Sequence, residues 1–259
     1  MSYGSTLFKG YRLQTFVIKC PYDTYRESEF TRTLMTDIFK LKFDGYRNHY
    51  PYGIMPISDY DFMANHICLT LENNGKYIPL FSYKSVTNEI CKKFRVPFPV
   101  IGHKFGEYKE NFTPWVNAIL DWQRKLDQQN ITYAYNASYT MNTQMDKDLR
   151  DLTRELTYAY LYYHYATENI KHVINSTASN HKINQHEEEM GWVYLKDKDG
   201  NKLPPFESPL FFEKPFYLMH TTENCFTENF RKKCEPYASL WERRIIIEED
   251  SADIKKKVA

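Results

Sequence analysis

The stretch from Asn180 to Trp192 holds the densest group of side chains that could do chemistry, with two histidines and three consecutive glutamates. Two histidines that bind one metal ion from a helix are normally four residues apart, because both rings must lie on the same face. His181 and His186 are five residues apart, so they point about 140° apart around a helix. We therefore expect no metal site. The glutamates form either a solvated helix face or a source of one acid/base group.

The motifs of several common enzyme classes are absent from the sequence. It contains no G-x-S-x-G nucleophile elbow, no Walker A loop and no dinucleotide-binding G-x-G-x-x-G. Asp59 and Asp61 in "SDYDF" could act as a carboxylate pair or simply shape the turn before a strand, and both interpretations stay open.

Composition narrows the class of protein. The formal net charge is +1, which does not favour binding of nucleic acid through its phosphates. The five cysteines are odd in number and show no C-x-x-C spacing, so we expect free thiols in a reducing compartment. No apolar run approaches the roughly 18 residues that span a bilayer, and the N-terminus lacks an apolar signal segment. These features predict a cytoplasmic protein without a membrane span.

The apolar periodicity predicts alternating strands and helices, which indicates an α/β domain with a mixed sheet. Strands are expected at 12–20, 65–72, 76–86, 131–141, 171–179, 191–195, 214–222 and 240–250, and helices at 24–43, 111–129, 145–169, 180–190 and 223–238. The two early strands form a hairpin with a turn at Asn74-Gly75. The segment 92–108, rich in Pro and Gly, is expected to run over the surface.

The second half resembles the GNAT superfamily of N-acetyltransferases. Members carry a short helix that begins at an Asn and ends at a Gly followed by an aromatic residue. Asn180, Gly191 and Trp192 stand in that register, after a strand, a long helix and a short strand. The resemblance implies one GNAT-like domain over 1–259, with a centrally splayed mixed sheet of about seven strands. Its parts would be an N-terminal strand, helix and loop (1–58), a core (59–221) and a C-terminal extension (222–259).

The first half is similar to a GNAT subgroup, the autoinducer synthases and N-acyl amino acid synthases. The residues that carry this likeness are Asp59, Asp61, His66, Gly75, Lys84 and Thr87. The resemblance implies that Asp59 and Asp61 bind the substrate, together with His220 on the last family-like strand.

The resemblance also implies a reaction, the transfer of an acyl group from a pantetheine thioester to an amine. The donor would be acyl-CoA or an acyl carrier protein, held where strands 131–141 and 171–177 splay apart. The family's positions then assign Gln144, Lys147, Asn180 and Ser138 to donor binding, and Glu187, Tyr139 and Asn136 to catalysis.

This sequence departs from the family pattern in three places. The acidic residue that members sometimes carry on the splayed strand falls near Asn136 or Ser138, and neither of these is a base. Lys147 and Leu149 replace the glycines of the pyrophosphate loop, and their side chains obstruct close approach of phosphate to the backbone. Glu187 replaces the tyrosine that often acts as the acid. A glutamate is ionised at pH 7 unless burial or a neighbouring carboxylate raises its pKa.

Two functions follow from these observations. The first is an acyltransferase acting on a small-molecule amine, an amino acid or its derivative being one candidate. The second is a non-catalytic GNAT-like module for binding or assembly, which the high content of Tyr and Phe would suit. Either function is compatible with a homo-oligomer.

Overall fold

The computed structural model describes residues 6–47, 57–179, 183–209, 215–221 and 225–249. The strands are β1 (Thr6–Phe8), β2 (Tyr11–Ile18), β3 (Asn65–Asn73), β4 (Lys76–Thr87), β5 (Tyr133–Met141), β6 (His172–Ala178), β7 (Val193–Tyr194), β8 (Phe206–Glu207), β9 (Pro215–His220) and β10 (Ile245–Ile247). The helices are α1 (Pro21–Thr24), α2 (Glu29–Tyr46), α3 (Tyr60–Met63), α4 (Asn88–Phe94), α5 (Val100–Phe105), α6 (Thr113–Gln128), α7 (Lys147–Thr167), α8 (Ile183–Met190), α9 (Glu228–Cys234) and α10 (Ala238–Glu242), with 3-10 turns η2 (Gly106–Phe112) and η4 (Glu235–Tyr237).

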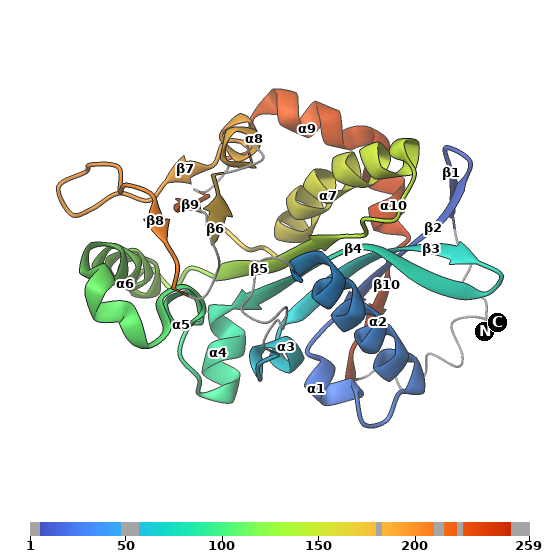
Figure 1. The fold of residues 1–259 in the computed structure, drawn as a ribbon, viewed down its shortest axis with the longest axis horizontal. Coiled ribbons are helices and arrows are strands. Elements are labelled where there is room, and N and C mark those ends of the chain that lie inside the picture. Colours follow the sequence, from blue (N-terminus) through green and yellow to red (C-terminus); the bar gives the residue numbers. More distant parts are fainter. Residues whose placement is uncertain (1–5, 48–56, 180–182, 210–214, 222–224, 250–259) are drawn as a thin grey trace.

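One mixed sheet runs through the whole molecule (Figure 1). Its order is β1-β2-β3-β4-β5-β6-β9-β7, with β10 beside β2 and β8 beside β9. Among the described strands, the pairs β5–β6 and β2–β10 are parallel and the others are antiparallel. The sheet has ten strands in the described part of the chain instead of about seven, and two of them, β1 and β8, match no strand expected from the sequence.

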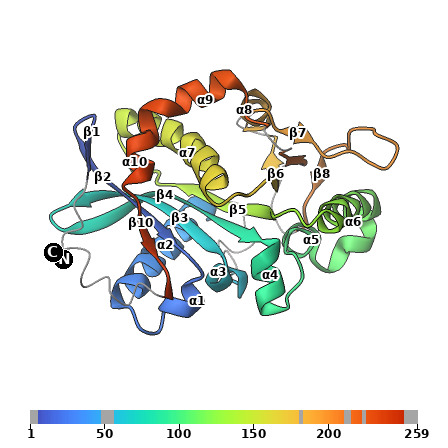
Figure 2. The same cartoon turned by 180° about the vertical axis from the view of Figure 1, so that it is seen from behind.

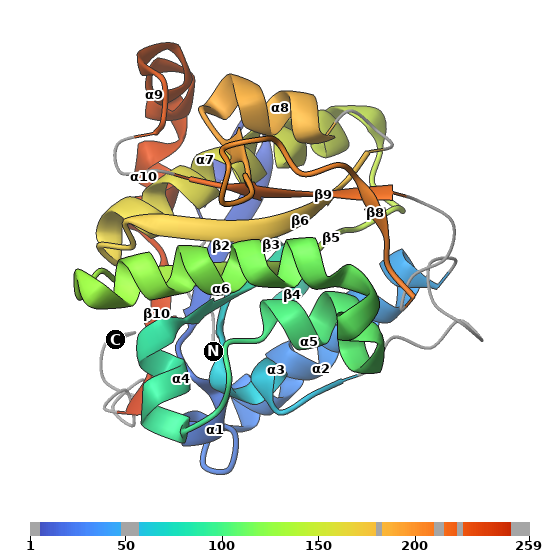
Figure 3. The same cartoon turned by 90° about the vertical axis from the view of Figure 1, so that its left-hand side faces the viewer.

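Helices cover both faces of the sheet. The helices α7, α8, α9 and α10 lie on one side, which we call the α7 face, and α1 to α6 lie on the other, which we call the α2 face (Figures 1 and 2). Figure 3, in which β6 and β9 run across the view, shows α7 and α8 above these strands and α5 and α6 below them. Separate clusters of buried side chains fill the two faces, around Leu156 and Tyr160 on the α7 face and around Leu34 and Ile38 on the α2 face.

The hairpin of β3 and β4 shows how local sequence sets these elements. Asn74 and Gly75 connect the strands with φ of +51° and +75°, which is the backbone of a two-residue hairpin turn and favours Asn-Gly. The predicted hairpin is confirmed. The helix α7 is also confirmed, and the Asp146 side chain caps it by accepting a hydrogen bond from Leu149 N.

The segment 92–108 corrects the sequence-based expectation of a surface run. It contains the end of α4, all of α5 and the start of η2. Val100 and Phe105 are fully buried, and Lys104 is 7% exposed. Proline and glycine signalled a loop, but the apolar spacing of Val100 and Phe105 docks the short helix α5 against the sheet.

Other features of the described residues bear on the class of protein. None of the described helices is both long and apolar enough to cross a membrane. All five cysteines are free thiols, four of them buried.

Candidate functional site

The parallel strands β5 and β6 separate after a short paired stretch. They pair only where Tyr133, Ala134 and Tyr135 face His172, Val173 and Ile174. Beyond Tyr135 and Ile174 neither strand pairs with the other, although β5 continues to Met141 and β6 to Ala178. The splay that the resemblance implied is therefore present.

A β-bulge turns the side chains of β5 within this diverging part. Two residues, Ser138 and Tyr139, lie opposite the single residue Tyr83 of β4, because the register shifts there. Ser138 takes the left-handed conformation with φ +56°. Tyr139 consequently points to the α7 face, where its hydroxyl contacts Thr157 Oγ1 at 3.4 Å. Strict alternation would have placed Tyr139 on the same face as Tyr135.

Glu187 of α8 is buried on the α7 face, directly against β6. Its two carboxylate oxygens accept hydrogen bonds from Asn175 Nδ2 at 2.7 Å and from Thr177 Oγ1 at 2.5 Å. Both donors lie on the part of β6 that has left β5. Burial raises the pKa of Glu187 to about 7, and the two hydrogen bonds only partly offset it. Glu187 is thus a carboxyl group that holds a proton near neutral pH.

Other polar groups share this region of the α7 face. Burial raises the pKa of Tyr158 on α7, and the neighbouring Tyr139 and Glu187 add to the shift. Asn136, the first residue of β5 beyond the paired stretch, is 8% exposed, and its Oδ1 has no hydrogen-bond partner among the described residues. A buried acceptor without a hydrogen-bond partner destabilises the fold. A molecule bound beside Asn136 could donate the missing hydrogen bond to its Oδ1.

On the α2 face, Tyr135 lies between the diverging strand β6 and helix α5. Its side chain is near that of Ser176 on β6, and its ring lies 5.4 Å from the ring of His103 on α5. Burial, together with the charges of Lys84 and Lys104, lowers the pKa of His103 to about 3.

The end of α2 is docked onto the bulge. The hydroxyl of Tyr46 donates to the backbone oxygen of Tyr139 at 2.6 Å. A Cβ on Gly45 would lie 2.3 Å from Thr140 Cγ2, so only glycine allows this close approach. The end of α2 therefore packs against the part of β5 that has left β6.

Two lysines on the α2 face share one buried carboxylate. Lys42 Nζ lies 3.4 Å and Lys84 Nζ 2.8 Å from Asp61 Oδ1, and all three side chains are at most 3% exposed. Burial would raise the pKa of Asp61, but the two ammonium groups hold it well below its usual range. Burial lowers the pKa of Lys42 to about 8. Two cations on one carboxylate leave one surplus positive charge in this cluster.

The start of α7, where the resemblance put donor phosphates, is occupied by the chain's own groups. The Asp146 carboxylate accepts from Leu149 N at 2.8 Å. Lys147 is exposed and pairs with Asp151 at 2.9 Å. Gln144 is exposed, and its backbone N–H donates to Asn142 Oδ1.

The remaining predicted residues do not join this site. Asp59 is exposed while Asp61 is buried, so the two do not form a carboxylate pair. His220 on β9 lies 6.2 Å from Trp122 of α6, and burial lowers its pKa. Asn180 lies outside the described residues.

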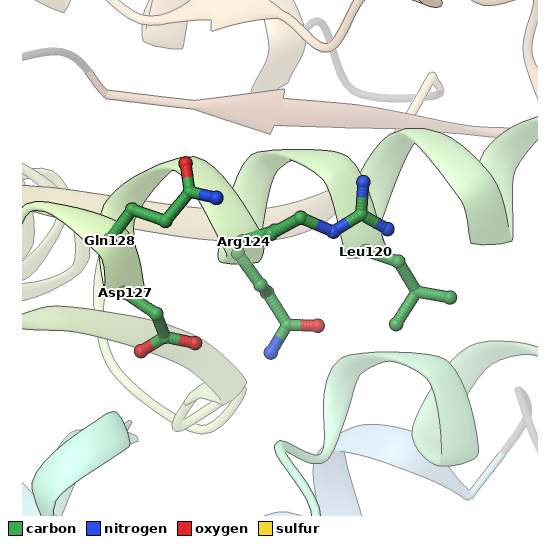
Figure 4. Close-up of a pocket in the computed structure, with 5 residues that line it drawn as sticks. Leu120, Arg124, Asp127 and Gln128 are labelled. Atoms are coloured by element: carbon green, nitrogen blue, oxygen red, sulfur yellow. The ribbon is translucent and has the colours of Figure 1, made fainter.

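Two hollows lie on the side of α6. One, of about 770 Å³, is lined by α6 and by residues near β7 and β9, including Trp122, Trp192 and His220. The other, of about 600 Å³, is lined by α6 alone, and Figure 4 shows Leu120, Arg124, Asp127 and Gln128 along it. Neither includes Glu187 or Asn136. No three His, Cys, Asp or Glu side chains of the described residues converge as a metal site would need.

Comparison with known proteins gives a likeness at the level of fold. No protein-family profile and no curated protein matches the chain. The N-acyl amino acid synthase FeeM from uncultured soil microbes has a similar structure, with a TM-score of 0.51 at 8% identity over 86% of this chain and 96% of that one. The CoA-dependent acyl-homoserine lactone synthase MesI gives a TM-score of 0.49 at 10% identity, over 87% of this chain and 95% of that one. A putative N-acetyltransferase from Lactobacillus plantarum gives 0.40 at 10%, over 81% and 97%.

The chain thus has a GNAT-like fold, as the resemblance implied, shared with an N-acyl amino acid synthase. Several residues of the site were not found from the sequence, among them Asn175, Thr177 and Tyr158. A signal was present for two of them, because Asn175 and Thr177 are polar residues two positions apart and so lie on the same face of β6. Nothing in the sequence pointed to Lys42 or His103, because their burial depends on how α2 and α5 pack against the sheet.

Proposed function

We propose that the chain is an acyltransferase that moves an acyl group from a pantetheine thioester, such as acyl-CoA, to an amine. The observation that carries this proposal is Glu187, a buried carboxyl group placed where β5 and β6 diverge. A group whose pKa lies near the working pH is suited to proton transfer.

The proposed reaction needs a proton donor for the departing sulfur. The amine nitrogen attacks the thioester carbon, the C–N bond forms and the C–S bond breaks. The departing sulfur takes its proton from the Glu187 carboxyl, and the amine proton leaves to solvent.

The donor arm finds hydrogen-bonding groups along the diverging strands. The backbone of β5 beyond Tyr135 has no partner on the β6 side, and the Asn136 amide offers an unpartnered oxygen. A pantetheine arm carries two amides that can pair with such groups. Tyr139 and Ser138 lie along the same stretch of β5.

The non-catalytic alternative also has an observation in its favour. Asp146 and Lys147 both contact residues of α7, and the side chain of Tyr135 on β5 lies near that of Ser176 on β6. A binding module would keep the contacts at the start of α7 and the contact between Tyr135 and Ser176. A transferase would break the contact between Tyr135 and Ser176 when the donor binds.

The test is direct. The purified chain is incubated with acyl-CoA donors of two to sixteen carbons and a mixture of amines and amino acids, and both free thiol and acylated amine are measured. We expect thiol release that depends on the amine, with one amide formed per thiol. Absence of thiol release with every donor would refute the proposal and favour the binding module.

A further inference from the structure

The side chains of Glu187, Asn175 and Thr177 contact one another in a closed ring. Asn175 Nδ2 lies 2.7 Å from Glu187 Oε1, and Glu187 Oε2 lies 2.5 Å from Thr177 Oγ1. The ring is closed by a third contact of 3.1 Å, between Thr177 Oγ1 and Asn175 Oδ1. Each of the three residues is at most 9% exposed, so water has little access to these contacts.

The three contacts need three hydrogen atoms, and the two neutral side chains supply only two. The amide of Asn175 supplies one. The hydroxyl of Thr177 has a single hydrogen and cannot donate to Glu187 and Asn175 at once. The count is the same whichever way the Asn175 amide is turned, because the amide places one N–H in the ring in either orientation. The third hydrogen must therefore be a proton on the Glu187 carboxyl, which then donates within the ring.

An ionised Glu187 leaves one contact of the ring without a hydrogen. The Thr177 hydroxyl then turns toward the carboxylate, because a hydrogen bond to a charged acceptor is the stronger one, and Asn175 Oδ1 loses its donor. A buried amide oxygen without a donor is unfavourable. The closed ring thus favours the protonated carboxyl, in the same direction as burial, and the two states differ by the rotation of one hydroxyl group.

The other groups around Glu187 leave this balance to the ring. Those that face it from α7 and β7 are tyrosines, which are uncharged at neutral pH: Tyr158, Tyr165 and Tyr194. On its own helix, His186 and Glu189 are exposed and lie 3.8 Å apart, and Glu188 is exposed as well. The groups that contact it from β6, Asn175 and Thr177, are neutral.

We propose that Asn175 and Thr177 are the positioning residues of the acid, which hold the Glu187 proton in the closed ring before transfer and stabilise the carboxylate afterwards. The inference rests on the proposed function for the transfer step, whereas the ring itself can be measured without a substrate. In that step the proton passes from Glu187 to the departing sulfur, which keeps the electron pair of the broken C–S bond. Thr177 keeps its own hydrogen and turns it from Asn175 to Glu187. Neither positioning residue exchanges a proton with the substrate.

The first test is an infrared titration of the chain without substrate. A protonated carboxyl group has a carbonyl stretching band that a carboxylate lacks, and the difference between the wild type and Glu187→Gln assigns the band of Glu187. We expect the band to persist at pH 6, where an ordinary glutamate is ionised, and to disappear as pH rises through about 7. Disappearance of the wild-type band below pH 5 would show that the ring is not closed, and would overturn the inference.

The same titration of Thr177→Val examines the hydroxyl. The carboxylate loses a donor in this variant, so the band should disappear about one pH unit higher than in the wild type. Thr177→Ser, which keeps the hydroxyl, should titrate like the wild type. A Thr177→Val band that titrates like the wild-type band would overturn the inference. If Thr177→Val does not fold, the wild-type titration decides alone.

The second test is kinetic, and it separates positioning from a merely structural role. In Thr177→Val the fall in kcat/KM at high pH should move up by the same pH unit, and kcat should fall about tenfold because the carboxylate left after transfer lacks a donor. Thr177→Ser should restore both. Thr70→Val, which removes a buried hydroxyl on β3 that donates to Gln14 O, should leave the pH profile in place.

The outcomes distinguish the inference from the proposed function. Thiol release with a Thr177→Val profile that coincides with the wild-type profile would overturn the inference and leave acyl transfer intact. Absence of thiol release with every donor would refute the proposed function and the transfer step with it, and the infrared titration would still decide whether the ring holds the proton.

Discussion

The buried position of Glu187 against β6 determines both its hydrogen bonds and its pKa. The residue is 6% exposed, and its carboxyl group accepts two hydrogen bonds, from Asn175 and Thr177. Burial removes the water that would stabilise the charge, and two neutral donors replace only part of it. The result is a pKa raised to about 7.

Glu187→Gln should abolish the proton donor while keeping the shape of the side chain. We expect kcat to fall about 10²- to 10⁴-fold, as is typical for loss of a general acid. The fall in wild-type kcat/KM above pH 7 should also disappear from what activity remains. Steady-state thiol release from pH 5 to 9 checks both. Glu188→Gln, at the next and exposed position, is the control, and an equal loss in both variants would contradict the assignment.

The same substitution should stabilise the protein at high pH. The folded pKa of Glu187 is raised, so its carboxyl group favours folding below the unfolded pKa of about 4.5, and that advantage is lost as pH rises through about 7. Glu187→Gln should therefore raise the free energy of unfolding by about 2–3 kcal/mol at pH 8 and by almost nothing at pH 4. Urea denaturation at the two pH values measures the difference. Equal stability of the two proteins at pH 8 would mean that Glu187 is not buried.

Gly191 is needed for its backbone and for the space above it. It has φ +102°, and a Cβ would lie 1.8 Å from the backbone oxygen of Cys225. Gly191→Ala should destabilise the fold by about 3 kcal/mol or more, because both the backbone strain and the overlap must be relieved. Gly102→Ala, where a Cβ meets nothing within 4 Å, is the control in the same thermal unfolding measurement. A fall in stability no larger than that of Gly102→Ala would contradict this account.

At the residue scale, the sequence pointed to Glu187 through its register with Asn180 and Gly191, but its protonation could not be predicted. That property depends on Asn175, Thr177 and the cover of α7, which are contacts between elements. The opposite outcome holds for Asp59 and Asp61. Their spacing allowed a carboxylate pair. At the start of α3, however, Asp59 is exposed to solvent, whereas Asp61 is buried and pairs with Lys42 and Lys84.

At the scale of elements, the start of α7 predicts how the donor is recognised. Its first turn is capped by Asp146, and Lys147 is paired with Asp151, so little positive charge is directed at a pyrophosphate. Charge-assisted hydrogen bonds to the pyrophosphate would favour acyl-CoA over acyl-pantetheine, which has no pyrophosphate. Because α7 offers few of them, we expect kcat/KM for the two donors to differ less than about tenfold. Steady-state kinetics with both donors checks this. A preference for acyl-CoA of a thousandfold would contradict it.

The elements that the sequence predicted well are those with a strong local signal. The hairpin of β3 and β4 has its Asn-Gly turn, and α7 has a regular apolar stripe. The bulge at Ser138 and the helix α5 were missed. A bulge is set by the register between β4 and β5, and the six residues of α5 are too few to show a clear period.

At the scale of the whole molecule, buried histidines should make the fold sensitive to acid. His66 and His164 are fully buried, and burial lowers the pKa of each to about 3. Both nitrogens of His164 lack a hydrogen-bond partner among the described residues. Histidine in the unfolded chain titrates near pH 6.5, so stability from these groups is full above that pH and is lost as pH falls toward 3.

His164→Leu should reduce this sensitivity. Between pH 6 and 4 the slope of unfolding free energy against pH should fall by up to about 1.4 kcal/mol per pH unit, which corresponds to one proton fewer taken up on unfolding. At pH 7 the variant should be as stable as the wild type or more so, because an unsatisfied polar ring is removed. Urea denaturation across this pH range is the measurement. An unchanged slope would show that His164 takes up its proton in the folded state.

The most direct test of the account is a structure of the chain with a non-reactive thioether analogue of an acyl-pantetheine thioester. We predict that the arm lies between β5 and β6, with its amides on the part of β5 from Asn136 to Met141 and its sulfur within hydrogen-bonding distance of Glu187. The contact between Tyr135 and Ser176 should be broken in that complex. An analogue bound elsewhere, such as in the hollow between α6 and β7, or bound with Glu187 away from the sulfur, would contradict the account.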